Sequence, residues 1–155
     1  MHEPKVYITV GTTSCGKSTW AKKMAKEQDF KIIAGDALRE MTYGQYVYRP
    51  GLEGMLKDSA LMMAYKWNTL HGNDVILDDA VWFLTPEKRS EVTGYIPSTH
   101  ITWVCFPVPT DEQVRQRRAN DLRGISLDTW VDIVHQHQKE LIYPRGQNVV
   151  HMESW

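Results

Sequence analysis

The residues from Gly11 to Ser18 have the types and spacing of a phosphate-binding loop. They read Gly-Thr-Thr-Ser-Cys-Gly-Lys-Ser and fit the pattern G-x-x-x-x-G-K-[ST]. Gly11 and Gly16 allow the backbone to take positive φ and to curl around an anion, so that main-chain amides face it at a helix N-terminus. In this pattern Lys17 reaches the β- and γ-phosphates, and the Ser18 hydroxyl completes a Mg²⁺ shell. The loop therefore predicts binding of a nucleoside triphosphate such as ATP.

The sequence around this loop has the order strand, turn and helix that the motif requires. Residues 5–10 are rich in the β-branched and aromatic residues of a buried strand. Residues 19–25 place apolar side chains at helical spacing. This context argues against a turn that only resembles the motif. The expected donor-binding residues of the loop are Gly11, Thr12, Thr13, Ser14, Cys15, Gly16, Lys17, Ser18 and Thr19.

Carboxylates follow two further predicted strands. Asp36 comes after residues 30–34, at the end of a strand, where a parallel sheet opens onto its ligand crevice. An N-cap of the next helical turn is an equally good interpretation of this aspartate. Asp78 and Asp79 close the apolar run of residues 74–79, and strand alternation lets only one of them face a metal ion. We assign Mg²⁺ to Ser18 and Asp79, with Asp78 as the open alternative.

The remaining elements alternate between strands and helices. Helices are expected to begin at Thr85-Pro86, at the capping box from Thr110 to Gln113, and at Ser126. Further strands are expected over residues 101–106 and 148–152. The chain is therefore expected to form an α/β P-loop NTPase fold, with a four- to five-stranded parallel sheet flanked by helices.

One long helix is expected between the second and third strands, over residues 52–70. Its larger apolar side chains follow one helical face and predict a stripe that packs into the core. This stripe consists of Leu52, Met55, Leu56, Ser59, Met63, Trp67 and Leu70.

The bulk composition is that of one globular domain over residues 1–155. Hydrophobic residues make up 42% of the chain and charged residues 24%, which is ordinary for a soluble protein. We find no membrane-length apolar run, no signal peptide and only two cysteines, and we therefore expect a cytoplasmic protein. A net charge of −1 argues against non-specific coating of nucleic acid, but not against an enzyme that holds one strand end.

The histidines and cysteines carry little functional signal. His135 and His137 lie two apart on a predicted helix, so they face different directions, and we reject a zinc site. Cys105 falls within a predicted strand and is interpreted as a buried thiol. Cys15, beside a helix N-terminus, is a candidate for a lowered pKa and oxidation.

Taken together, these motifs resemble the kinase domain of bacteriophage-type polynucleotide 5′-hydroxyl kinases. The loop with its Trp20-Ala21 tail, Asp36-x-x-Arg39, the third strand followed by residues 84–89, and the arginines up to Arg123-Gly124 occur in the family's order. The chain departs from the family at Asp79-Ala80-Val81 and by one extra residue between the lid arginines. The family's phosphatase motif does not follow, so we expect no 3′-end repair activity here.

This resemblance implies a role for each matching residue. Asp36 would be the general base, Arg39 would hold an acceptor phosphate, and Arg123, in a helical lid over about residues 110–128, would neutralise the transferring phosphoryl group. Arg118 or Arg117 would assist it, and we assign Arg118 to the donor site. Phosphoryl transfer depends mainly on such positioning and charge neutralisation. The implied catalytic set is Asp36, Lys17, Arg39 and Arg123, with ATP and Mg²⁺ as donor and metal.

The implied acceptor is the 5′-hydroxyl end of DNA or RNA, in the host cytoplasm if the protein is phage-encoded. Tyr43, Tyr46, Tyr48 and Trp82 are candidates for stacking on terminal bases, although packing under a loop explains them equally well. A nucleoside, nucleotide or modified-base kinase is the first alternative. A nucleotide-binding switch or NTPase without an acceptor is the second, and the Asp36-x-x-Arg39 pair argues against it. A homo-oligomer is possible, but the sequence does not predict one.

Overall fold

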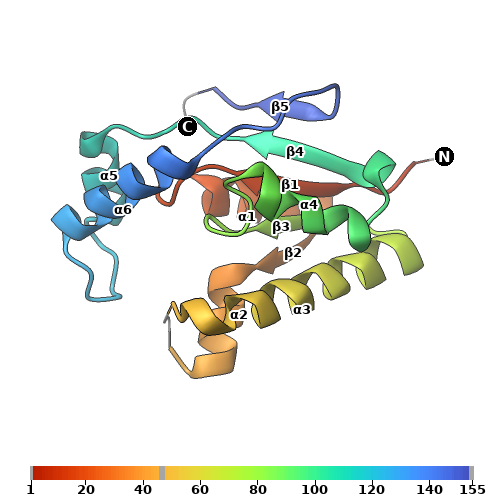
Figure 1. The fold of residues 1–155 in the computed structure, drawn as a ribbon, viewed down its shortest axis with the longest axis horizontal. Coiled ribbons are helices and arrows are strands. Elements are labelled where there is room, and N and C mark those ends of the chain that lie inside the picture. Colours follow the sequence, from red (N-terminus) through yellow and green to blue (C-terminus); the bar gives the residue numbers. More distant parts are fainter. Residues whose placement is uncertain (1, 46–47, 154–155) are drawn as a thin grey trace.

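The computed structural model describes residues 2–45 and 48–153, which fold around one five-stranded sheet (Figure 1). Its order is β2-β3-β1-β4-β5 and every neighbouring pair is parallel. The strands are β1 (Val6–Val10), β2 (Lys31–Ala34), β3 (Val75–Asp78), β4 (Ile101–Cys105) and β5 (Val149–His151). The predicted parallel α/β sheet flanked by helices is confirmed, with all five strands present.

Helices connect the strands. They are α1 (Lys17–Gln28), α2 (Gly35–Tyr43), α3 (Glu53–Tyr65), α4 (Pro86–Ser90), α5 (Asp111–Arg118) and α6 (Leu127–Glu140). Side-chain caps start three of them as the sequence predicts: Thr85 accepts from the Lys88 amide, Thr110 forms a full capping box, and Ser126 accepts from the Thr129 amide. None of the helices in the described residues is long and apolar enough to cross a membrane.

The two faces of the sheet carry different halves of the core. Val6, Ile8 and Val10 of β1 are buried on the face covered by α3, together with Val75 and Leu77 of β3. On the opposite face, Tyr7 and Ile76 pack with α1 through its Trp20 and Ala21, and with Phe106 just beyond β4. This alternation follows from the two-residue period of a strand. Both faces are therefore covered, as a parallel sheet requires.

The buried face of α3 differs from the prediction. Of the predicted stripe only Leu56 is buried, whereas Met55, Met63, Trp67 and Leu70 are exposed. The helix instead packs through Leu56, Ala60, Leu61 and Ala64, because the small alanine side chains let its backbone approach the sheet closely. Most of the large apolar side chains of this helix lie on its exposed face, so a prediction based on their spacing selects that face as the buried one. After Tyr65 the helix continues as a π-helical turn, Lys66–Leu70, and Gly72 then takes φ +70°.

The carboxyl ends of the strands meet at one side of the sheet, where α5 and α6 also gather (Figure 1). The loop after β1, the start of α2 after β2, and the end of β3 all lie at this edge. The predicted functional residues are therefore brought to one place by the topology, as is usual for open parallel sheets.

Candidate functional site

The loop from Gly11 to Lys17 joins β1 to α1 and has the conformation of an anion cradle. Gly16 takes φ +95° and precedes the first residue of α1. The second left-handed residue is Ser14, at φ +63°, rather than Gly11. Gly11 is required for space instead, because a Cβ there would lie 2.9 Å from the Cys15 Sγ and 3.2 Å from the Phe106 Cβ. The amides that follow lie at the unpaired N-terminus of α1, where an anion is stabilised.

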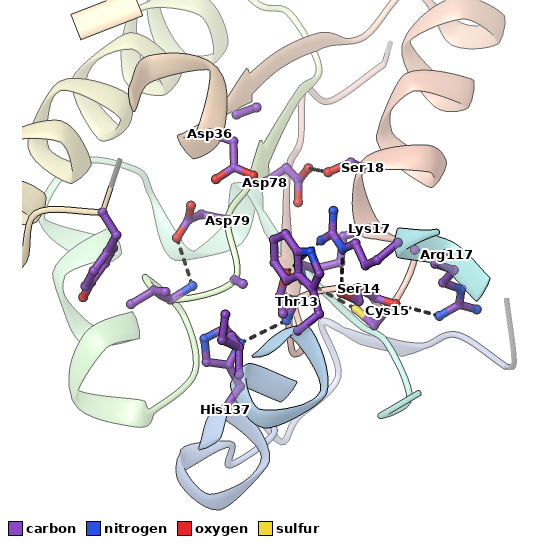
Figure 2. A pocket seen from close by; sticks show the side chains of 18 of the residues that line it. Thr13, Ser14, Cys15, Lys17, Ser18, Asp36, Asp78, Asp79, Arg117 and His137 are labelled. Carbon is purple, nitrogen blue, oxygen red and sulfur yellow. Dashed lines mark hydrogen bonds between the residues drawn. The ribbon is translucent and has the colours of Figure 1, made fainter. Parts of the chain in front are cut away.

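This loop forms one wall of a cavity of about 780 Å³. Asp36, Asp78 and Asp79 line the same cavity from the ends of two neighbouring strands. Figure 2 shows these carboxylates across from Lys17 and the loop. The Lys17 ammonium, which is buried, donates to the carbonyls of Gly11 and Thr12 within the loop. The cavity therefore has a cationic, amide-lined wall facing an acidic one.

Ser18 contacts Asp78 and not Asp79. Its hydroxyl donates to the Asp78 Oδ2 at 2.8 Å (Figure 2). Thr9 of β1 donates to the Asp78 Oδ1 at 3.0 Å. Among the described residues no cationic side chain forms an ion pair with Asp78, although its carboxylate is buried. A buried carboxylate beside a serine hydroxyl is a hard-oxygen donor set that suits Mg²⁺. The geometry thus favours Asp78, the alternative left open by the sequence, over Asp79 as the metal ligand.

Asp79 instead belongs to an ion-pair network centred on Arg39. The Arg39 Nη1 donates to Asp79 Oδ1 at 2.7 Å and to Asp36 Oδ1 at 2.8 Å, and its other nitrogens bind the Glu53 carboxylate. Asp79 also accepts the backbone amides of Val81 and Trp82. Burial opposes the charge on Arg39, but the hydrogen bonds and charges of Glu53 and Asp79 outweigh it and raise the pKa of this guanidinium. The Asp79 carboxylate is therefore held by Arg39 and by two backbone amides.

Arg39 lines the cavity, but its guanidinium is already engaged by carboxylates of the protein. Its side chain is only 2% exposed and is paired with three carboxylates. A guanidinium in this state holds Asp36 and does not present its charge to an acceptor phosphate. Sequence reasoning missed Glu53, the third partner, because it comes from α3 and no local pattern links it to Arg39.

Asp36 lies in the first turn of α2 rather than at its cap, since Ala34 is the N-cap residue. Its side chain is half exposed and accepts from two arginines. Arg39 binds Oδ1, and Arg123 from the segment after α5 donates to Oδ2 at 3.2 Å. The predicted base and the predicted lid arginine are thus in direct contact with each other.

The other two lid arginines bind the phosphate-binding loop itself. Arg117 donates to the Ser14 carbonyl at 2.8 Å, and Arg118 donates to the Ser14 Oγ and the Thr13 Oγ1 at 2.8 and 3.0 Å (Figure 2 for Arg117). Both candidates for the assisting role therefore reach the loop. Arg118 and Arg123 also share Asp121, whose pKa is held down to about 2, mainly by its hydrogen bond from Arg123.

His137 is a site residue that sequence reasoning considered only as a metal ligand. Its Nδ1 accepts the Thr13 amide at 3.0 Å, which joins α6 to the loop (Figure 2). Burial, followed by the nearby charges of Lys17 and Lys88, lowers its pKa to about 4, so the ring is neutral at pH 7 and able to accept. Within the described part of the chain, no group of three or more His, Cys, Asp or Glu side chains is placed to hold a metal ion.

The four stacking candidates have different surroundings. Trp82 is buried and donates from Nε1 to Glu53, so it is not available to a base. Tyr48 is 45% exposed and lines the cavity, with its ring centroid 5.9 Å from the Arg39 guanidinium carbon. Tyr43 is partly buried and carries the Arg49 guanidinium over its ring at 4.7 Å. Tyr46 lies outside the described residues.

Both cysteines are buried. Burial raises the pKa of Cys105 to about 11, which agrees with its interpretation as an inert thiol. Cys15 packs in the cluster beneath α1 and contacts the Lys17 ammonium at 3.5 Å. A thiol so enclosed does not have the exposure that oxidation requires.

Comparison with known families identifies this arrangement. The profile of a family described as an AAA domain matches residues 6–123, from β1 into the predicted lid. The chain belongs to the AAA domain family. No curated protein sequence is similar enough to this AAA-domain chain to count as a match.

Solved structures with similar folds include kinases of several kinds. A gluconokinase from Sinorhizobium meliloti 1021 superposes with a TM-score of 0.69 at 15% identity, over 99% of this chain and 85% of that one. A chain of the Pnkp1/Rnl/Hen1 RNA repair complex gives 0.69 at 21% identity over 90% of this chain, which spans only 46% of that chain. Shikimate kinase from Bacteroides thetaiotaomicron gives 0.59 at 17%, over 87% and 78%. This AAA domain thus has a kinase-like P-loop fold.

Proposed function

We propose that the protein is a Mg²⁺- and ATP-dependent kinase that phosphorylates a hydroxyl group, with the 5′-hydroxyl end of DNA or RNA as its acceptor. One observation carries the phosphotransferase part of this proposal. The Asp36 carboxylate lies in the same cavity as the phosphate-binding loop, held by Arg39 and Arg123 (Figure 2 for Asp36 and the loop). A switch that only binds or hydrolyses a nucleotide needs no carboxylate in this position.

In the proposed reaction the acceptor oxygen forms a bond to the γ-phosphorus while the bond from that phosphorus to the β–γ bridging oxygen breaks. ADP leaves, and the hydroxyl proton passes to Asp36. Arg39 and Arg123 keep this carboxylate oriented, and Lys17 with Arg118 offsets the charge on the phosphates. Ser18 and Asp78 would hold Mg²⁺, which supplies charge neutralisation to the donor when bound.

The half-exposed ring of Tyr48 supports an acceptor that carries a base. It lines the cavity, with its ring centroid 5.9 Å from the guanidinium carbon of Arg39, the residue that binds Asp36. An aromatic face at the mouth of a site can stack on a terminal nucleobase of any sequence. The similarity to a chain of an RNA repair complex is consistent with this acceptor class.

The state of Arg39 favours a second candidate, a kinase of a small hydroxyl compound. Arg39 is enclosed by three carboxylates, so the residue expected to bind an acceptor phosphate is already neutralised. A nucleoside or another acceptor without a phosphate beside its hydroxyl needs no such cation. The similar fold of a gluconokinase is consistent with this class.

One assay separates these candidates. The protein is incubated with γ-labelled ATP and Mg²⁺, together with 5′-hydroxyl DNA or RNA oligonucleotides, nucleosides, nucleoside monophosphates, sugars, or no acceptor. Label on oligonucleotide ends supports the proposal, and label on small acceptors alone supports the second candidate. Release of phosphate without any labelled acceptor overturns both. The Lys17→Ala variant is the control, since it removes the loop cation and should weaken binding and transfer together.

A further inference from the structure

The lid arginines Arg118 and Arg123 are held as a pair at the mouth of the phosphate-binding loop. Both bind the Asp121 Oδ2, at 3.0 and 2.9 Å, and Arg118 also reaches the hydroxyls of Thr13 and Ser14. Two guanidinium groups this close repel each other. Burial, and then the charge of Arg123, lowers the pKa of Arg118. Arg123 also pairs with Asp36 at 3.2 Å, and an aromatic contact adds to these ion pairs.

Trp130 of α6 provides that contact. The Arg118 guanidinium carbon lies 3.9 Å from the centroid of its indole ring, and that of Arg123 lies 4.9 Å away. The face of an indole is electron-rich and attracts cations more strongly than the face of a tyrosine or phenylalanine ring. This attraction strengthens when the groups are shielded from water, and Trp130 is only 2% exposed.

The indole is also fixed in place. Val114 of α5 and Val131 and Val134 of α6 are buried around it, in a small core cluster separate from those on the sheet faces. Its Nε1 is buried and has no hydrogen-bond partner among the described residues. The polar contacts of Trp130 in the described structure are therefore made by the ring face, toward the two arginines, and not by its N–H group.

We infer that Trp130 is a positioning residue, whose indole face holds Arg118 and Arg123 together where the terminal phosphate of a bound nucleoside triphosphate meets the lid. The arginines are then in place before the nucleotide arrives, so less ordering is needed when the charge on the phosphate develops. The inference rests on the proposed use of the cavity for a triphosphate, but not on the identity of the acceptor.

The test compares Kd values for ADP and ATP without any acceptor, by titration calorimetry on the full chain. The lid arginines act on the terminal phosphate, so the ratio of the ADP Kd to the ATP Kd reports their placement. Trp130→Leu should lower this ratio by roughly 5- to 30-fold, and Trp130→Phe, which keeps an aromatic face, by less than about 3-fold. If the leucine variant does not fold, Trp130→Met is measured in its place.

Two controls separate positioning from packing. Val134→Ala removes volume from the same buried cluster and should lower stability while leaving the ratio unchanged. In an Arg118→Ala/Arg123→Ala background, Trp130→Leu should have no further effect on the ratio. The proposal is overturned if the leucine variant keeps the wild-type ratio, if Val134→Ala lowers it equally, or if the effect persists without the arginines. Failure of oligonucleotide labelling by the wild-type chain would overturn the acceptor assignment and leave this result standing.

Discussion

At the scale of single residues, Asp36 owes its position to two cations of different kinds. Arg39 is buried and rigid, held by Glu53 and Asp79, whereas Arg123 comes from a more open segment and shares Asp121. The Oδ1 of Asp36 thus accepts from Arg39, and its Oδ2 accepts from Arg123 of the predicted lid. Both oxygens of this carboxylate are therefore held, which fixes the orientation of the proposed base.

Asp36→Asn tests the role of this carboxylate. The amide keeps the shape of the side chain but cannot take up the proton, so transfer should fall by about 10²- to 10⁴-fold. ATP affinity should stay within a few-fold of wild type, because Asp36 does not belong to the loop. Labelled transfer and calorimetric titration measure the two effects.

Asp29→Asn is the matched control for this substitution, since the Asp29 side chain is 98% exposed at the end of α1. It should leave both transfer and ATP affinity unchanged. An Asp36→Asn variant that loses ATP binding would show that Asp36 is structural and not a base.

Gly35 allows β2 and β3 to end side by side with their carboxylates in place. A Cβ there would lie 2.0 Å from the Asp79 Oδ1, an oxygen already held by Arg39. Gly35→Ala should therefore destabilise the fold by on the order of 1–3 kcal/mol, although alanine is the better helix former. Urea denaturation monitored by circular dichroism measures the change.

Gly54→Ala provides the comparison within another helix. No atom lies within 4 Å of a Cβ built at Gly54, so the helix propensity of alanine should stabilise the protein by about 0.5–1 kcal/mol. Equal effects of the two substitutions would contradict the crowding argument at Gly35.

At the scale of elements, α6 contributes more to the site than its position near the end of the sequence suggests. It carries Trp130 beneath the lid arginines and His137 against the loop amide of Thr13. Its Ser126 cap and its contacts with α5 fix the direction in which both side chains project. The helix thus connects the predicted lid segment with the phosphate-binding loop.

His137 should make this connection sensitive to acid. Its folded-state pKa of about 4 lies below the 6.5 of an unfolded histidine, so the unfolded chain binds the extra proton first as pH falls. The stability that the neutral ring contributes is complete above pH 6.5 and is lost progressively between 6.5 and 4. Its full size is on the order of 3 kcal/mol.

His137→Asn removes the titration while keeping an oxygen close to where Nδ1 accepts the Thr13 amide. The free energy of unfolding of this variant should fall less than that of wild type between pH 6.5 and 4, as urea denaturation at each pH would measure. His135→Asn, on the exposed side of the same helix, is the control and should not reduce that fall. Parallel pH curves for wild type and His137→Asn would contradict the assignment.

At the scale of the whole molecule, the parallel sheet gathers residues from three strand ends into one cavity, and these are the residues proposed to bind the donor and the metal and to act as the base. Binding of Mg²⁺-ATP there should stabilise the folded chain by about 2.7 kcal/mol at a ligand concentration 100 times the Kd. For a protein of this size that corresponds to a rise in Tm of roughly 5–10 °C. Thermal denaturation with ATP, with and without EDTA, separates the part that depends on the metal.

Asp78→Asn should remove most of the metal-dependent rise in Tm, because Asp78 is the carboxylate in contact with Ser18. Asp79→Asn should lower the Tm of the ligand-free protein, since it weakens an ion pair with the buried Arg39, but should retain the response to Mg²⁺. The reverse pattern would return the metal to Asp79.

The amino-acid sequence by itself determined the elements whose signals are local. The phosphate-binding loop, the three capped helix starts and the five strands depend on residues within a few positions of one another, so backbone preferences and apolar periodicity were enough to predict them.

Only the tertiary structure decided which side chains of distant segments meet. Ser18 contacts Asp78, and Glu53 pairs with Arg39. The buried face of α3 is the one that carries its alanines. From α6, Trp130 contacts the arginines of the predicted lid and His137 contacts the loop. These contacts join residues far apart in the chain, and the packing of helices onto the sheet selects among partners that local spacing leaves equivalent.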